Sequence, residues 1–184
     1  MQSFSSSKVS TLVRILLAGS EGKTASAAWV DADQDGRGGF GGLSRQERFE
    51  LDCEYRAFLR KHLIQRHWDA LIARYTVEPD ERAPAIERLA RIIATPAHSH
   101  FKSYAIVAWA IPQRAGVEGK RSTIVLREDI YDMARWDNNQ GTSERTMRRW
   151  RGYIHEMLNE ALDLAIAAAI HLLEGQELFE REVA

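Results

Sequence analysis

The sequence predicts a mainly α-helical protein: a helical bundle with one small antiparallel β element and a long last helix. Three observations support this fold class. Apolar residues recur at spacings of three and four between charged residues, which is typical of amphipathic helices. One central stretch is continuously apolar and β-branched, and the final third carries one amphipathic pattern of about thirty residues. The 184 residues suffice for one domain with a real core and a flexible arm.

The first segment, residues 1–43, is rich in Ser and Gly, and we expect a flexible arm with one short helix around Ser10 to Leu17. Within it, "DADQDG" starts at Asp31 like a calcium-binding EF-hand loop. The twelfth loop position requires a bidentate Glu, but this chain has Gly42 there. A Gly/Asp linker is therefore favoured over a calcium site.

The helical domain is expected over residues 44–184. A capping box at Ser44 and Glu47 predicts a helix that runs to about His62. "IQRHWDALIARYT" predicts a second helix and "RAPAIERLARIIATP" a third, with Pro84 near its first turn. We expect these three helices to form a small bundle.

The β element is predicted after Pro96. "SYAIVAWAI" is an almost unbroken apolar run, and "STIVL" is a short β-branched run further along the chain. The segment between them contains two glycines, so the pattern predicts two antiparallel strands joined by a loop.

The final third predicts a short helix, a turn and a long helix. "REDIYDMARW" is the short helix, "DNNQG" is the turn, and the long helix begins at Thr142 or Ser143 and ends near Gly175. Its predicted buried stripe is Met147, Trp150, Ile154, Leu158, Ala161 and Leu162. This order, over about residues 127–158, is that of a helix-turn-helix unit, whose second helix enters the DNA major groove.

Charge is concentrated at the start of this long helix. The chain as a whole has a net charge of −1, but Thr142 to Arg151 holds four arginines and one glutamate, a local charge of +3. A helix N-terminus and the arginine fork both favour phosphate. The candidate nucleic-acid-binding residues are Ser143, Arg145, Thr146, Arg148, Arg149 and Arg151.

The alternative for these arginines is a solvated helix face. Glu156 and Glu160 follow on the same helix and are candidates for intrahelical ion pairs. From Glu156 to Ala184 the chain has seven acids and one arginine, a net charge of −6.

Little in the sequence indicates catalysis. The six histidines have no metal-ligand spacing, and no nucleophile, paired-carboxylate or dinucleotide motif occurs. The single cysteine, Cys53, fits a half-buried core thiol in a reducing compartment. We therefore expect a cytoplasmic protein that is not an enzyme, binds no metal or cofactor, and does not enter the membrane.

The segment "GTSERTMRRWRGYIHEMLNEAL" resembles the C-terminal helix-turn-helix ends of phage late-transcription regulators, the Q-type antiterminators and their sigma-region-like relatives. More loosely, "YRAFLRKHLIQRHWDALIARYT" and "YDMARWDN" are similar to phage-encoded proteins of unassigned function. The first resemblance covers some 20 residues and implies a DNA-facing helix start. Two features depart from it: six residues separate Trp136 from Ser143, and the paired cysteines of some antiterminators are absent.

The sequence thus predicts a phage or prophage transcription regulator that binds double-stranded DNA, and the resemblance adds RNA polymerase as a further partner. The alternative is a phage protein-interaction module that binds or inhibits a host protein without binding DNA. In that case the apolar C-terminal helix forms the interface of a homodimer.

Overall fold

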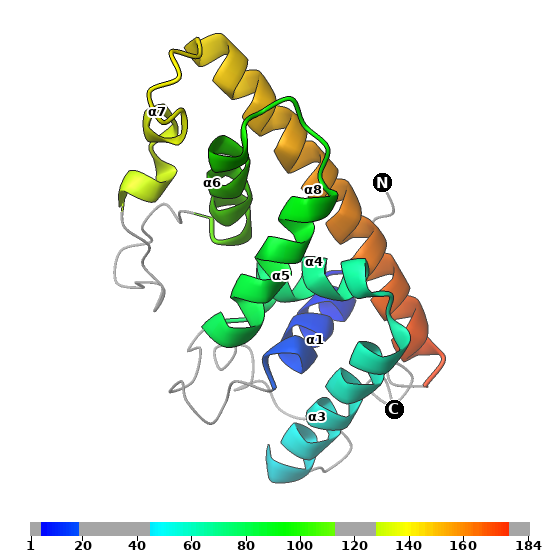
Figure 1. Ribbon diagram of the computed structural model, residues 1–184. Coiled ribbons are helices and arrows are strands. Elements are labelled where there is room, and N and C mark those ends of the chain that lie inside the picture. Colours follow the sequence, from blue (N-terminus) through cyan, green and yellow to red (C-terminus); the bar gives the residue numbers. More distant parts are fainter. Residues whose placement is uncertain (1–4, 19–44, 113–127, 177–184) are drawn as a thin grey trace.

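The computed structural model describes residues 5–18, 45–112 and 128–176 (Figure 1). All regular structure in these ranges is helical, and no strand occurs in them. The elements are α1 (Ser6–Leu17), α3 (Arg45–His62), α4 (Gln65–Tyr75), α5 (Pro79–Ile92), α6 (Ser99–Ala110), the 3-10 helix η1 (Glu128–Tyr131), α7 (Met133–Trp136) and α8 (Glu144–Glu174).

The predicted β element is wrong where it can be compared, because "SYAIVAWAI" lies within and just after α6. This helix packs against α4, α5 and α8, so several of its sides are apolar and no polar stripe marks the helical period. Its start is capped by His98, whose Nδ1 accepts the Phe101 N–H at 3.3 Å. The second proposed strand, "STIVL", lies outside the described residues.

Helix α1 belongs to the hydrophobic core, although the predicted boundary at residue 44 assigns it to the arm. Leu12 and Ile15 are fully buried, and Leu16 is 1% exposed. The helix packs against α3, α4 and α8. The expected helix at Ser10 to Leu17 is thus present, and it begins four residues earlier. The acidic loop from Asp31 to Gly42 lies outside the described residues.

Helices α4 and α5 form an antiparallel hairpin with a short connection. Asp69 of α4 is 2% exposed, and its carboxylate accepts three hydrogen bonds from the Arg88 guanidinium of α5 at 2.7 to 3.1 Å. The start predicted for α5 is wrong, because Pro79 occupies the first turn and Pro84 lies inside the helix. A proline is tolerated in the first turn because the N–H groups there have no intrahelical partner.

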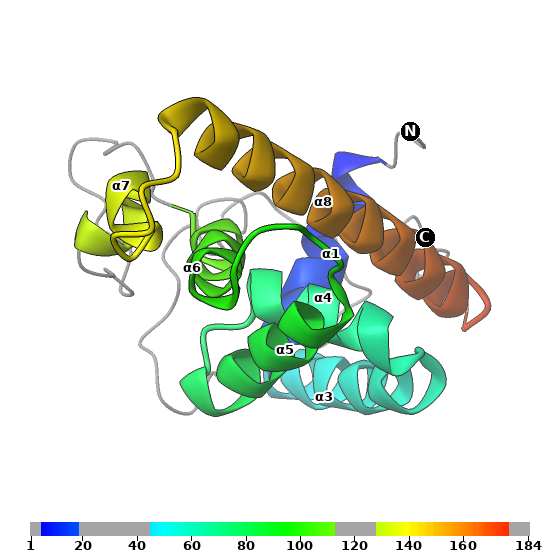
Figure 2. The same ribbon diagram turned by 45° about the horizontal axis from the view of Figure 1, so that its top comes forward.

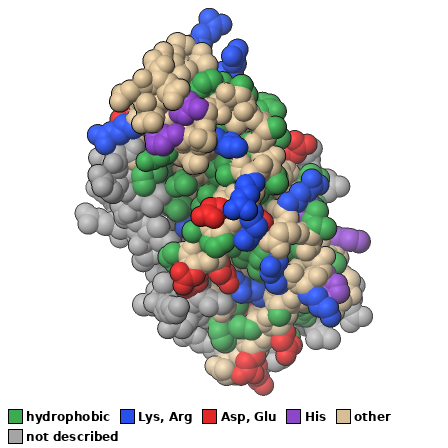
Figure 3. Space-filling view, viewed as in Figure 1, with side chains coloured by type: hydrophobic (Ala, Val, Ile, Leu, Met, Phe, Trp, Pro, Cys, Tyr) green, Lys and Arg blue, Asp and Glu red, His purple; other side chains and the backbone are tan. Residues whose placement is uncertain are grey.

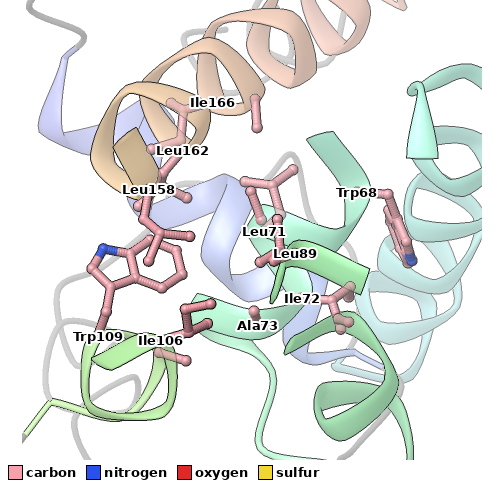
Figure 4. Packing of buried hydrophobic residues seen from close by; sticks show 14 of the residues in the cluster. Trp68, Leu71, Ile72, Ala73, Leu89, Ile106, Trp109, Leu158, Leu162 and Ile166 are labelled. Carbon is pink, nitrogen blue, oxygen red and sulfur yellow. The ribbon is translucent and has the colours of Figure 1, made fainter. Parts of the chain in front are cut away.

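Helix α8 spans the whole molecule and packs against α1, α3, α4 and α6 (Figures 1 and 2). The sequence predicts that the helix begins at Thr142 or Ser143 and ends near Gly175; Ser143 caps its start and Gly175 follows its end. Figure 4 shows the core between α8 and the bundle, with Trp109 of α6 beside Leu158. Of the predicted stripe, Met147, Ile154, Leu158 and Leu162 are buried, while Trp150 and Ala161 are half-buried. Among the described helices, none combines the length and apolarity that a membrane span requires.

Candidate nucleic-acid interface

A tight turn between α7 and α8 sets the position of the α8 start. Asn138, Asn139 and Gly141 have φ values of 50°, 60° and 73°, in the left-handed region that Asn and Gly adopt most readily. The Asp137 carboxylate accepts the Thr142 N–H at 3.1 Å. Hydrogen bonds from the Thr142 side chain and from backbone N–H groups lower the pKa of Asp137, so it stays ionised and keeps the turn closed.

The first turn of α8 has a side-chain cap. The Ser143 Oγ accepts the Thr146 N–H at 3.3 Å and lies 2.9 Å from the Thr146 Oγ1. Both hydroxyl groups therefore have a structural role, which fixes where the helix begins. Of the six candidate residues, these two act as the cap, and the four arginines supply the charge.

All four arginines are exposed. Arg148 pairs with Glu144 one turn earlier, at 2.5 Å between Nη2 and Oε1. This pair is open to solvent on both sides, so it contributes little stability. For Arg145, Arg149 and Arg151, no carboxylate within the described part of the chain lies at ion-pair distance. The intrahelical pairs with Glu156 and Glu160 that the solvated-face alternative invokes are not formed.

The arginines repel one another around the helix. At about 100° per residue, Arg145, Arg148 and Arg149 fall within an arc of about 100°. Three pairs are spaced by three or four residues, namely 145 with 148, 145 with 149 and 148 with 151, and each like-charge pair costs about 0.2–0.5 kcal/mol. Helix stability therefore does not explain the cluster. Figure 3 shows Lys and Arg side chains at the end of the molecule where α8 begins.

Charge is also divided along α8. The first 12 residues, Glu144 to His155, hold the four arginines and one glutamate, a net charge of +3. The remaining 19 residues, Glu156 to Glu174, hold four acids and no lysine or arginine, a net charge of −4. Positive charge thus lies at the start of the helix, and three of the four acids follow it in the middle of the helix. The fourth, Glu174, pairs with Lys8 of α1 at 2.6 Å.

An aromatic cluster formed by α6, α7 and α8 packs against the arginine end of α8. The Trp150 ring lies 5.4 Å from the Phe101 ring and 6.1 Å from the His98 ring, edge to face in both cases. Trp136 of α7 meets Phe101 in the same geometry at 5.4 Å. Because Trp150 is half-buried against this cluster, it packs with the core, as predicted, and is not presented for base stacking.

The predicted helix-turn-helix unit is wrong in one respect, because α7 has only four residues and packs against α6 and η1. Trp136 explains this arrangement: it is 1% exposed, and its indole N–H donates to the Ile130 carbonyl at 2.8 Å. The anchored tryptophan holds α7 on α6. A four-residue helix also cannot cross the second helix as the first helix of such a unit does.

A contact between His98 and Asp137 could not be predicted from the sequence. His98 Nε2 and Asp137 Oδ1 are 3.8 Å apart, and both atoms are buried without a hydrogen bond. Since the His98 Nδ1 accepts the Phe101 N–H, the neutral ring carries its proton on Nε2, facing the carboxylate. This contact lies between the start of α6 and the turn before α8.

A second histidine makes the α6–α8 contact sensitive to pH. His155 Nε2 lies 3.1 Å from the Ala105 carbonyl, and burial, with Arg151 and Arg74 nearby, lowers the pKa of His155 below its ordinary value. The unfolded chain therefore binds this proton more readily, and the stability contributed by His155 is present above about pH 6.5 and lost as the pH falls. Chemical denaturation at pH 7.5 and pH 5.5 should show that the free energy of unfolding falls less with acid for His155→Gln than for the parent. The glutamine amide can still donate to the Ala105 carbonyl. An equal loss in both proteins would contradict this assignment.

The part of the chain that the structure describes contains no group of three side chains arranged to hold a metal ion. Comparison with known proteins gave no match to any family model, curated protein or solved structure.

Proposed function

We propose that the start of α8 binds the backbone phosphates of double-stranded DNA. The observation that supports this proposal most directly is the set of three exposed arginines, Arg145, Arg149 and Arg151, without a carboxylate partner among the described residues. Phosphate is the ligand class that uses such a cluster best, because the guanidinium fork donates two parallel hydrogen bonds to it. The positive end of the α8 macrodipole adds to the attraction.

The proposed role of the protein is that of a phage-type transcription regulator acting in the cytoplasm, with RNA polymerase as a further partner. This wider role rests on the resemblance of residues 141–162 to antiterminator ends. In it, the α8 start contacts DNA as a single exposed helix end, because α7 is held on α6.

Titration of a random-sequence duplex across a salt series tests the proposal. Each phosphate neutralised by Arg or Lys contributes about 0.9 to the slope of log affinity against log salt. The double variant Arg145→Gln, Arg149→Gln should therefore reduce the slope of log affinity against log salt by about 2, with the helical circular dichroism unchanged. Arg135→Gln on α7, whose side chain is 63% exposed, is the matched control and should keep the parent slope.

If the double variant keeps the parent affinity and slope, the α8 start is a solvated face. The protein-interaction alternative then takes its place, and two exposed side chains on α8 favour it. Tyr153 is 46% exposed and Leu164 is 49% exposed.

A further inference from the structure

A second basic surface lies where α3 ends, α4 begins and α5 ends. Its sequence signal is the segment Tyr55 to Trp68, which holds four Lys or Arg residues and no acid, a local charge of +4. We call it the α4-entry surface and define it by Arg60, Lys61, Arg66 and Arg91.

The cations of the α4-entry surface are exposed. Lys61, Arg66 and Arg91 have no ion pair with any residue in the described ranges. Arg60 is held in place, because its Nη1 donates to the Gln65 Oε1 at 3.0 Å and its guanidinium lies 5.4 Å from the centre of the Trp68 ring. This part of the surface is thus fixed by the fold, while the remaining charges are free to meet a ligand.

The α4–α5 hairpin brings the fourth cation to this surface. The contact between Asp69 and Arg88 fixes the antiparallel register, so the first turn of α4 lies beside the last turn of α5. Both ribbon views show these two helix ends next to each other (Figures 1 and 2). Arg91 on α5 therefore joins Arg66 on α4, although 25 residues separate them in the chain.

We propose that the α4-entry surface binds backbone phosphates of the same DNA duplex that the α8 start contacts, an inference that rests on the proposed function. Figure 3 shows Lys and Arg side chains over α4 and α5 on the same face as those at the α8 start. Helix α4 packs against the middle of α8, near Leu162 (Figure 4). Leu162 is about 20 Å along the axis from Arg149 at about 1.5 Å per residue, which is less than one helical turn of DNA, about 34 Å.

Phosphate fits this surface better than an acidic protein does. Ile64 and Ile92 are 54% and 57% exposed here, but they lie among the cations, whereas a protein interface places its apolar residues in a core with few charges. The free cations come from three helices and spread over a surface. Such a spread suits a polymer that carries a regular series of charges.

The test uses fluorescence anisotropy of a random-sequence duplex longer than two helical turns, across a salt series. The variant Lys61→Gln, Arg66→Gln, Arg91→Gln should reduce the steepness of the salt dependence by about 2 to 3, at about 0.9 per phosphate. Its melting temperature should match that of the parent, since these side chains make no ion pair in the described residues. The charge-retaining variant Lys61→Arg, Arg66→Lys, Arg91→Lys should restore the parent slope, and Ile92→Ser is the uncharged control.

The two proposals fail in distinguishable ways. If the salt dependence of binding becomes less steep in the triple variant but not in the Arg145 and Arg149 variant, the α4-entry surface binds phosphate and the α8 assignment is wrong. If the triple variant keeps the parent affinity and slope, the inference is overturned and the α8 proposal stands. A parent that binds no duplex at any salt overturns both proposals.

Discussion

Replacing Trp136 by alanine is expected to lower the free energy of unfolding by about 3–5 kcal/mol, as for other fully buried aromatic side chains. The side chain is 1% exposed, it packs on Phe101, and its N–H donates to the Ile130 carbonyl. The substitution leaves a cavity and an unpaired carbonyl, and it removes the anchor that holds α7 on α6. The turn that starts α8 should loosen with it.

Denaturant unfolding of Trp136→Ala beside Arg135→Ala measures this effect. Arg135 is the neighbouring residue, and its side chain is 63% exposed, so its loss should change the free energy of unfolding by no more than about 0.5 kcal/mol. A loss of less than about 1 kcal/mol for Trp136→Ala would show that α7 is not part of the cooperative core.

Ile15→Ala should destabilise the protein by about 2–5 kcal/mol. Ile15 is fully buried in α1, between elements that follow it by 30 residues or more. If residues 1–43 were only an arm attached to a complete domain, the same substitution would cost almost nothing.

Thermal and denaturant unfolding of Ile15→Ala and Ser10→Ala distinguish these cases. Ser10 lies on the same helix and is exposed, so its replacement should have little effect. An unchanged free energy of unfolding in both variants would support a domain boundary at residue 44.

The helices that the sequence predicted well are those in which charged and polar residues interrupt the apolar ones. In α3, α4 and α8 the apolar residues recur at spacings of three and four, and Ser143 and Gly175 mark the limits of α8. In α6 the same rule failed, because every residue from Tyr104 to Ile111 is apolar, and a fully apolar run lacks a period.

Long-range packing was the part that local patterns could not show. The pattern of α1 predicted a helix, but nothing in it indicated that Leu12 and Ile15 fill the core between α3, α4 and α8. Arg145, Arg148 and Arg149 lie opposite the apolar stripe of α8, which accounts for their exposure. Arg151 lies on the same side as the stripe, so its exposure does not follow from the spacing. The position of α7 was not, since it depends on Trp136 meeting Phe101, and the α4-entry surface depends on the register of the α4–α5 hairpin.

The division of charge along α8 has a kinetic consequence. A helix of 31 residues is about 46 Å long at about 1.5 Å per residue, and here the first 12 residues carry +3 and the remaining 19 carry −4. In the field of a polyanion the arginine end is attracted and the acidic stretch that begins at Glu156 is repelled, so the molecule turns while it is still diffusing and its arginine end arrives first. For the proposed DNA complex, encounters in the wrong orientation should thereby be fewer at low ionic strength, and added salt should slow association before it shortens the lifetime of the complex.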